Sequence, residues 1–176
     1  NLFGLYYLDL SFNQISSIQM DTLMSMTKLL ELDLSSNCLF FLNRNLFRNL
    51  ENLCSLKLND NRIKHLNSFV FENLKSLSFL NMSNNLLQNF TKLKDLDNLV
   101  VLDLSQNVLL REVDINFFKL EYLNLNFNNR LMKFDYLNYL PNLKRLHLSN
   151  LNDLGQMNFS LFKNFIEQSR FLCSIV

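Results

Sequence analysis

The chain is poor in the residues that make tight turns. It has 2 glycines and 1 proline in 176 residues, which argues against a fold built from many hairpins, because hairpin turns depend on these residue types. Its formal net charge of +1 gives no electrostatic footprint for binding nucleic acid or an anionic membrane. No apolar run approaches the roughly 20 residues that a membrane-spanning helix needs.

Cysteine and glycine also lack any arrangement that marks a cofactor. Cys38, Cys54 and Cys173 are odd in number and follow no CxxC or Cys/His spacing, so zinc and haem signatures are absent and buried free thiols are expected. Gly4 and Gly155 stand alone, which excludes a phosphate-binding loop. We therefore expect no metal and no cofactor.

What the chain does contain is one short pattern, repeated. Apolar residues make up 48% and charged residues 19%, which fits one folded domain of this length. The template LxxLxLxxN recurs at steps of 24, 24, 24, 22, 21 and 23 residues. Its copies open at Leu5, Leu29, Leu53, Leu77, Leu99, Leu120 and Leu143. The seventh copy departs from the template, because Asn150 comes one residue early and Leu151 takes the expected place.

The repeat predicts a stack of similar coils. Leu32 and Leu34 alternate with Asp33, so we expect a short strand there with leucines inward, followed by a turn and an extended or helical return. One copy cannot bury its leucines alone, so neighbouring copies must share a core. Their strands would lie parallel, about 4.8 Å apart.

The asparagine that ends each template has a structural explanation. Backbone groups left unpaired where each strand turns inward would cost about 1–3 kcal/mol each. An amide side chain has both donors and an acceptor, so one residue can bond its own turn and the next copy. The predicted ladder consists of Asn13, Asn37, Asn61, Asn85, Asn107 and Asn128.

Over residues 2 to about 165 the pattern resembles the leucine-rich repeat family, and Phe47 and Phe71 suit its 24-residue subtype. The resemblance implies an α/β repeat solenoid, a right-handed curved stack with parallel strands on the concave face. We expect this solenoid at residues 1–165 and a degenerate or truncated tail at 166–176. Neither end supplies a clear polar cap, so we expect the parent protein to extend both ways.

Residues outside the scaffold form columns across the concave face. The consecutive copies bearing Phe79, Val101 and Tyr122 give an apolar stripe, which fits a binding anchor or simply the preference of strands for such residues. The predicted ligand-binding set is Phe79, Val101, Tyr122, Arg145, Asp103, Asn124 and His147.

Charged residues in these columns have two explanations each. Asp9 and Asp33 suggest paired acid/base catalysis or a cation site, but an open surface favours a solvated acidic face. Lys144, Arg145 and His147 form a basic patch, either solvated or directed at an acidic partner. His147 and Asp103 are two strands apart, with no serine or cysteine to complete a triad. No catalytic residues are therefore assigned.

Asn81, Asn89 and Asn158 lie in NxS/T sequons, which predict N-glycosylation if the chain is secreted. The resemblance extends to Toll-like and adhesion receptors. It implies an extracellular, non-enzymatic recognition module that binds a protein, glycan or lipid ligand and dimerises with another repeat chain. Two alternatives remain open: a cytosolic scaffold or regulatory subunit, and a regulatory repeat domain attached to an enzyme.

Overall fold

The computed structural model describes residues 2–91, 93 and 96–152. The predicted tail at 166–176, the sequon at Asn158 and Cys173 lie outside these residues. Seven strands form one parallel sheet in the order β1-β2-β3-β4-β6-β8-β9. Their bounds are β1 Tyr7–Asp9, β2 Glu31–Asp33, β3 Ser55–Lys57, β4 Phe79–Asn81, β6 Val101–Asp103, β8 Tyr122–Asn124 and β9 Arg145–His147.

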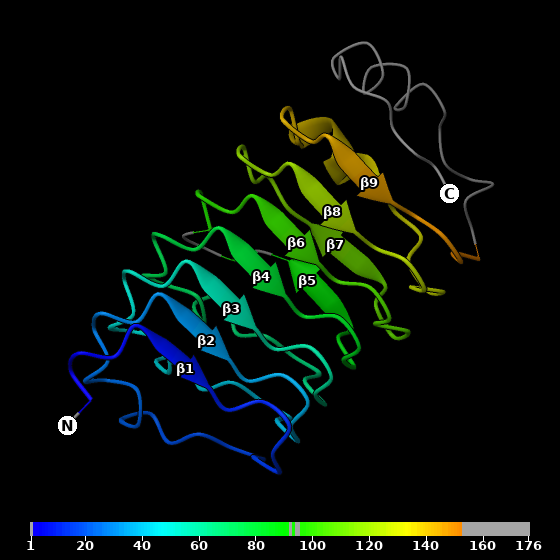
Figure 1. The fold of residues 1–176 in the computed structure, drawn as a ribbon. Coiled ribbons are helices and arrows are strands. Elements are labelled where there is room, and N and C mark those ends of the chain that lie inside the picture. The colour runs from blue at the N-terminus through cyan, green and yellow to red at the C-terminus, as the bar shows by residue number, and fades with distance from the viewer. Residues whose placement is uncertain (1, 92, 94–95, 153–176) are drawn as a thin grey trace.

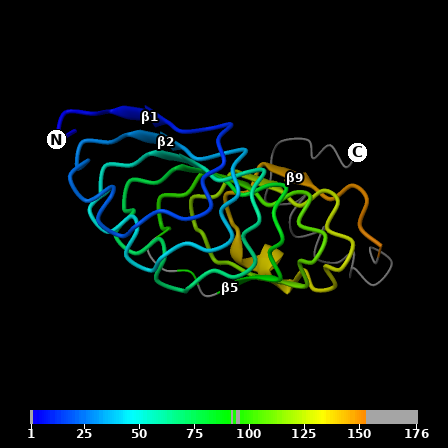
Figure 2. The same ribbon diagram turned by 90° about the horizontal axis from the view of Figure 1, so that it is seen from below.

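Each strand pairs with the equivalent residues of the next coil. Leu32 pairs with Leu8 on one side and Leu56 on the other, without any shift of register. Figure 1 shows the strands side by side, and Figure 2 shows the coils as successive loops with β5 on the side opposite β1, β2 and β9. The expected right-handed curved stack, with parallel strands on its concave face, is confirmed.

The template leucines fill a continuous interior. Leu29, Leu32 and Leu34 are all at most 1% exposed, and the corresponding leucines of the next four coils are equally buried, with Met82 in one such place. Phe47 and Phe71 extend this interior on the return side, with stacked rings whose centroids lie 6.2 Å apart. The coils therefore share one core, because no coil has enough apolar surface to enclose its own leucines.

The return segments differ with coil length. In the 24-residue coils the return is turn-rich, whereas the coils opening at Leu77 and Leu99 are shorter and have extended returns. These extended returns pair as a second parallel sheet, β5 Asn89–Thr91 with β7 Glu112–Asp114. An extended residue spans about 3.3 Å, against about 2 Å in a 3-10 helix, so fewer residues cover the same distance.

The helical part of the expected α/β solenoid is small. Within the described residues the helix is the short 3-10 helix η1, Asp135–Tyr139, in the return of the coil that opens at Leu120. No helix in this part of the chain is long and apolar enough to cross a bilayer. The returns are therefore mostly turns and extended chain, rather than α-helix.

The asparagine ladder lies inside the stack. The Asn37 side chain donates from Nδ2 to the carbonyl oxygens of Leu34 at 3.2 Å, Ser35 at 3.0 Å and Leu10 at 2.9 Å. Its Oδ1 accepts from the backbone N–H of Ile15 at 2.9 Å. The bridge therefore runs to the preceding coil, not to the next one as the sequence suggested. Asn61, Asn85 and Asn107 repeat both contacts. Asn128 also bridges to the preceding coil, but its Oδ1 accepts from the backbone N–H of Asn107 itself.

Asn13 departs from the ladder. It is exposed, and its Nδ2 donates only to Leu10 and Ser11 in its own turn. Among the described residues there is no coil on the far side of Asn13, so its amide has no neighbour to bridge. The expected inward bridge is therefore absent at this position.

A left-handed residue immediately precedes every ladder position. Its φ lies between 50° and 61° in each coil, a conformation that most side chains avoid. The residues concerned are Phe12, Ser36, Asp60, Asn84, Gln106, Phe127 and Asn150. Asn150 thus occupies the turn position, and Leu151, buried behind it, occupies the ladder position.

Tyr136 in η1 has a buried hydroxyl that forms no hydrogen bond within the described part of the chain. Burial raises the pKa of this phenol well above its ordinary value. Since burying an unpartnered hydroxyl is unfavourable, Tyr136→Phe is expected to stabilise the protein by about 1 kcal/mol in urea unfolding. Tyr139→Phe is the matched control in the same helix, because Tyr139 is 64% exposed. A destabilised Tyr136→Phe variant would contradict this expectation.

Candidate functional site

The concave face presents one row of side chains across four neighbouring strands. Phe79, Val101, Tyr122 and Arg145 are successive partners in the register of β4, β6, β8 and β9. The first three are half-buried, and Arg145 is exposed. Their outward direction follows from strand alternation, because the leucine after each of them points into the core. The fold thus brings this part of the predicted set together.

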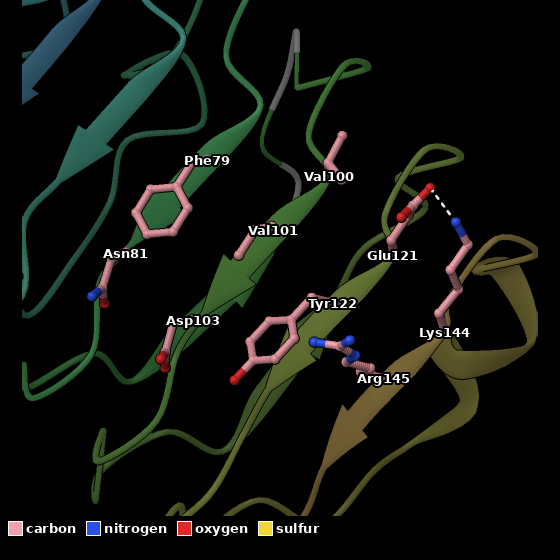
Figure 3. A pocket seen from close by; sticks show the side chains of 9 residues that line it. All are labelled: Phe79, Asn81, Val100, Val101, Asp103, Glu121, Tyr122, Lys144 and Arg145. Atoms are coloured by element: carbon pink, nitrogen blue, oxygen red, sulfur yellow. Dashed lines mark ion pairs between the residues drawn. The ribbon is translucent and has the colours of Figure 1, made fainter. Parts of the chain in front are cut away.

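A hollow of about 590 Å³ lies over this row, within the size range of ligand pockets. Figure 3 shows the rings of Phe79 and Tyr122 on either side of the smaller Val101. The lining residues are Phe79, Asn81, Val100, Val101, Asp103, Glu121, Tyr122, Lys144 and Arg145. The hollow combines an apolar floor with polar side chains at both ends of the strands.

The lining includes two residues that the sequence analysis did not assign, Val100 and Glu121. Each directly precedes its strand, in the column that continues to Lys144 on the next copy. The signal was present, since Val100, Glu121 and Lys144 occupy the same template position. Strand alternation alone does not assign Val100 and Glu121 to the face, because both lie just outside their strands.

The outward position between the two inward leucines of each strand, held by Asp103 in β6 and Asn124 in β8, serves mainly to close turns. Asp103 accepts from the backbone N–H of Ser105 at 2.8 Å and from its hydroxyl at 2.6 Å. Its other oxygen accepts from Asn124 Nδ2 at 3.0 Å, and Asn124 in turn accepts from the N–H of Asn126. Side chains that bond their own backbone two residues on stabilise tight turns. These hydrogen bonds give Asp103 and Asn124 a structural role at the strand ends.

His147 and Asn124 do not line the hollow. The His147 ring lies against Tyr122 with 5.2 Å between ring centroids. It therefore supports one wall from outside. Of the predicted ligand-binding set, the hollow gathers Phe79, Val101, Tyr122, Arg145 and Asp103.

The charges around the hollow are unequally paired. Lys144 Nζ lies 2.7 Å from Glu121 Oε1 (Figure 3), whereas Arg145 forms no ion pair with any described residue. Burial raises the pKa of the Tyr122 phenol, the Asp103 carboxylate adds to this, and the Arg145 charge opposes it. Tyr122 therefore stays neutral and can donate a hydrogen bond from its hydroxyl.

At the other end of the face, the acidic pair is only partly solvated. Asp9 is exposed, but Asp33 is half-buried and accepts from Lys57 Nζ at 2.9 Å. Burial works against ionisation of Asp33, yet hydrogen bonds from Ser35 and Lys57 outweigh it and lower its pKa. The same contact raises the pKa of Lys57. The sequence predicts a solvated acidic face here, which fits Asp9, whereas Asp33 is half-buried and paired with Lys57.

The two described sequons differ in surroundings. Asn81 is half-buried beside the hollow, and its Oδ1 accepts from the N–H of Ser83 at 2.9 Å. Asn89 is exposed on β5, away from the concave sheet. Cys38 and Cys54 are free thiols, as expected, but they are half-buried rather than buried.

Known proteins resemble this chain in sequence pattern and in fold. The family model described as leucine rich repeat matches residues 3–63, 39–87 and 51–109. No curated protein sequence matches the chain. The solved structure of TLR13 in complex with ssRNA13 is 25% identical, with a TM-score of 0.70 over 93% of this chain and 27% of that chain.

Two further structures show the same coil stack. The glycosylated Toll–Spätzle complex of Drosophila is 27% identical, with a TM-score of 0.75 over 83% of this chain and 22% of that chain. The leucine-rich repeat domain of APL1B is 20% identical, with a TM-score of 0.57 over 96% of this chain and 63% of that chain, and it shows the fold alone. The chain thus spans about a quarter of the TLR13 and Toll chains.

Proposed function

Because the chain belongs to the leucine-rich repeat family, a family of generally non-enzymatic protein-binding repeats, we propose that it forms part of an extracellular recognition receptor of Toll-like or adhesion type. The observation that best supports a binding role is the hollow lined by Phe79, Val101 and Tyr122 on the concave face. Half-exposed aromatic side chains gathered in one depression are characteristic of interaction sites.

The partner is proposed to be a protein. Toll is solved in a complex with Spätzle and TLR13 with ssRNA13, but a net charge of +1 and acidic residues in the lining favour a protein over a nucleic acid here. A glycan or lipid ligand, and pairing with a second repeat chain, are further modes of recognition for such a surface.

Removing both aromatic walls should weaken recognition without unfolding the chain. The double variant Phe79→Ala, Tyr122→Ala is expected to reduce binding about 30-fold, the loss associated with truncating an interface hot spot. Binding is measured as staining of intact cells by the fluorescently labelled, tetramerised chain. Phe118→Ala, Tyr139→Ala is the matched control, because these two aromatics are 66% and 64% exposed elsewhere. Equal staining by both double variants would count against the hollow as the binding surface.

The cellular location is tested on the full-length protein that contains this chain. A membrane-impermeant amine-reactive label applied to intact cells should modify the protein, and glycosidase treatment should increase its mobility on a gel. Asn89→Gln should remove one glycan, since Asn89 is the exposed sequon among the described residues. An unlabelled protein without glycans would instead support the cytosolic scaffold.

A further inference from the structure

The central recess of the hollow arises from one small residue between two large ones. Val101 is paired with Phe79 on one side and Tyr122 on the other. Strands about 4.8 Å apart place the two aromatic residues about 10 Å apart across Val101. Because the valine side chain is shorter than either ring, a depression opens above it, with Val100 extending the apolar floor.

An aromatic or large aliphatic side chain suits this depression. The rings of Phe79 and Tyr122 remain half-exposed in the unbound chain, so an inserted apolar group would remove apolar surface from water on both walls. Aromatic side chains also interact favourably through ring faces and edges at centroid distances of 4.5–7 Å. Such an anchor is the type of residue that dominates binding at protein interfaces.

The charge next to the recess indicates what accompanies that side chain. Lys144 forms an ion pair with Glu121, and Asp103 accepts hydrogen bonds from Ser105 and Asn124. Arg145 has no such partner among the described residues, and Figure 3 shows its guanidinium beside the Tyr122 ring. A free guanidinium binds carboxylates through two parallel hydrogen bonds.

The same arrangement disfavours a polyanion. Asp103 and Glu121 belong to the lining and equal Lys144 and Arg145 in number, so the hollow offers a run of phosphates no excess of positive charge. A single carboxylate beside an apolar side chain meets the guanidinium alone. Electrostatic complementarity therefore favours an acidic peptide segment over a nucleic acid.

We propose that this hollow binds a protein segment in which an aromatic or large aliphatic residue, seated between Phe79 and Tyr122, is followed by a residue whose carboxylate pairs with Arg145. This inference rests on the proposed recognition function and specifies the chemistry of the partner. It predicts that apolar–acidic segments are preferred over apolar–basic ones at this surface.

The absence of tryptophan from the chain allows a direct test. N-acetyl-Trp-Glu-amide and N-acetyl-Trp-Lys-amide are titrated, up to millimolar concentration, with the purified full chain, and tryptophan fluorescence anisotropy then reports only the peptide. We expect the Trp-Glu peptide to bind about fivefold more tightly, a ratio typical of one partly exposed ion pair. The difference should shrink as salt is added.

Two single variants separate the parts of the site. Arg145→Gln should lower Trp-Glu binding to the Trp-Lys level, whereas Arg48→Gln, an exposed arginine on a return segment, should change neither. Val101→Phe should fill the recess and weaken both peptides about tenfold or more. Glu31→Phe places the same ring in the same row on β2, outside the hollow, and should leave binding intact.

A thermal melt of each variant checks that the stack is folded. If Val101→Phe has a lowered Tm, Phe79→Ser replaces it, because that substitution removes one aromatic wall of the recess. The proposal is overturned if neither peptide binds, if both bind equally, or if filling the recess changes nothing. These measurements test the binding preference on the purified chain, whereas the receptor proposal is tested by labelling on cells. Either proposal can therefore be rejected without the other.

Discussion

Replacing Asn61 with leucine is expected to lower the free energy of unfolding by about 2–4 kcal/mol. The Asn61 amide donates to the carbonyl oxygens of Leu34, Leu58 and Asn59, and accepts from the N–H of Leu39 at 2.9 Å. Leucine fits the volume of the site but offers no hydrogen bonds, so buried backbone groups in two coils lose their partners. Urea unfolding and a thermal melt measure the loss, with a fall in Tm of about 5–10 °C.

The matched control is Asn13→Leu. Asn13 holds the same template position but is exposed and bonds only its own turn, so water can replace its contacts. Its substitution should change the free energy of unfolding by no more than about 0.5 kcal/mol. If the two variants lost similar free energies of unfolding, the bridge between coils would not be the source of the asparagine's stabilising effect.

Truncating Phe71 should be at least as damaging. Phe71 is fully buried on the return side, and its ring stacks on Phe47 at 6.2 Å with 15° between ring planes. Removing a buried phenylalanine ring leaves a cavity and typically costs about 3–5 kcal/mol. Phe71→Ala is therefore expected to lower Tm by about 10 °C or more.

Phe118→Ala provides the comparison for Phe71→Ala, since the Phe118 ring is 66% exposed. It should alter the melt by only a degree or two, because surface truncations cost about 0.5 kcal/mol or less. If the two alanine variants melted alike, the stacked pair of Phe47 and Phe71 would contribute little to holding neighbouring coils together.

The concave sheet was predictable because the template imposes it locally in every coil. Leu32 and Leu34 point inward and Asp33 outward, as alternation requires, and the 24-residue step places Leu32 beside Leu56. The inward asparagines followed from the need to pair buried backbone groups. Their direction of bridging did not, because a template read along one coil does not show which neighbour its turn approaches.

The second sheet could not be predicted from the template, which leaves the return undefined. Most copies have an apolar residue six positions before the opening leucine, but Leu120 has Asp114 there. The structure explains this exception, since Asp114 is exposed at the end of β7 and pairs with Thr91. The relevant signal was coil length, because the copies of 22 and 21 residues have the extended returns.

The candidate site was predictable in its central row and not in its charges. Phe79, Val101 and Tyr122 follow from strand register alone. The ion pair between Lys144 and Glu121, with 2.7 Å between Nζ and Oε1, depends on the rotamers of both side chains. The sequence does not specify these rotamers. Because that pair leaves Arg145 as the cation of the lining without an ion pair to any described residue, the proposed binding preference depends on side-chain positions as well as on the sequence.

Residue-resolved amide hydrogen exchange tests the shared, amide-bridged interior most directly. The Leu39 N–H bonds to Asn61 Oδ1 and the Ile63 N–H bonds to Asn85 Oδ1. Both should exchange as slowly as strand amides in the parent chain. In Asn61→Leu, exchange at Leu39 should become fast while Ile63 stays protected. Fast exchange at Leu39 in the parent chain would contradict the ladder.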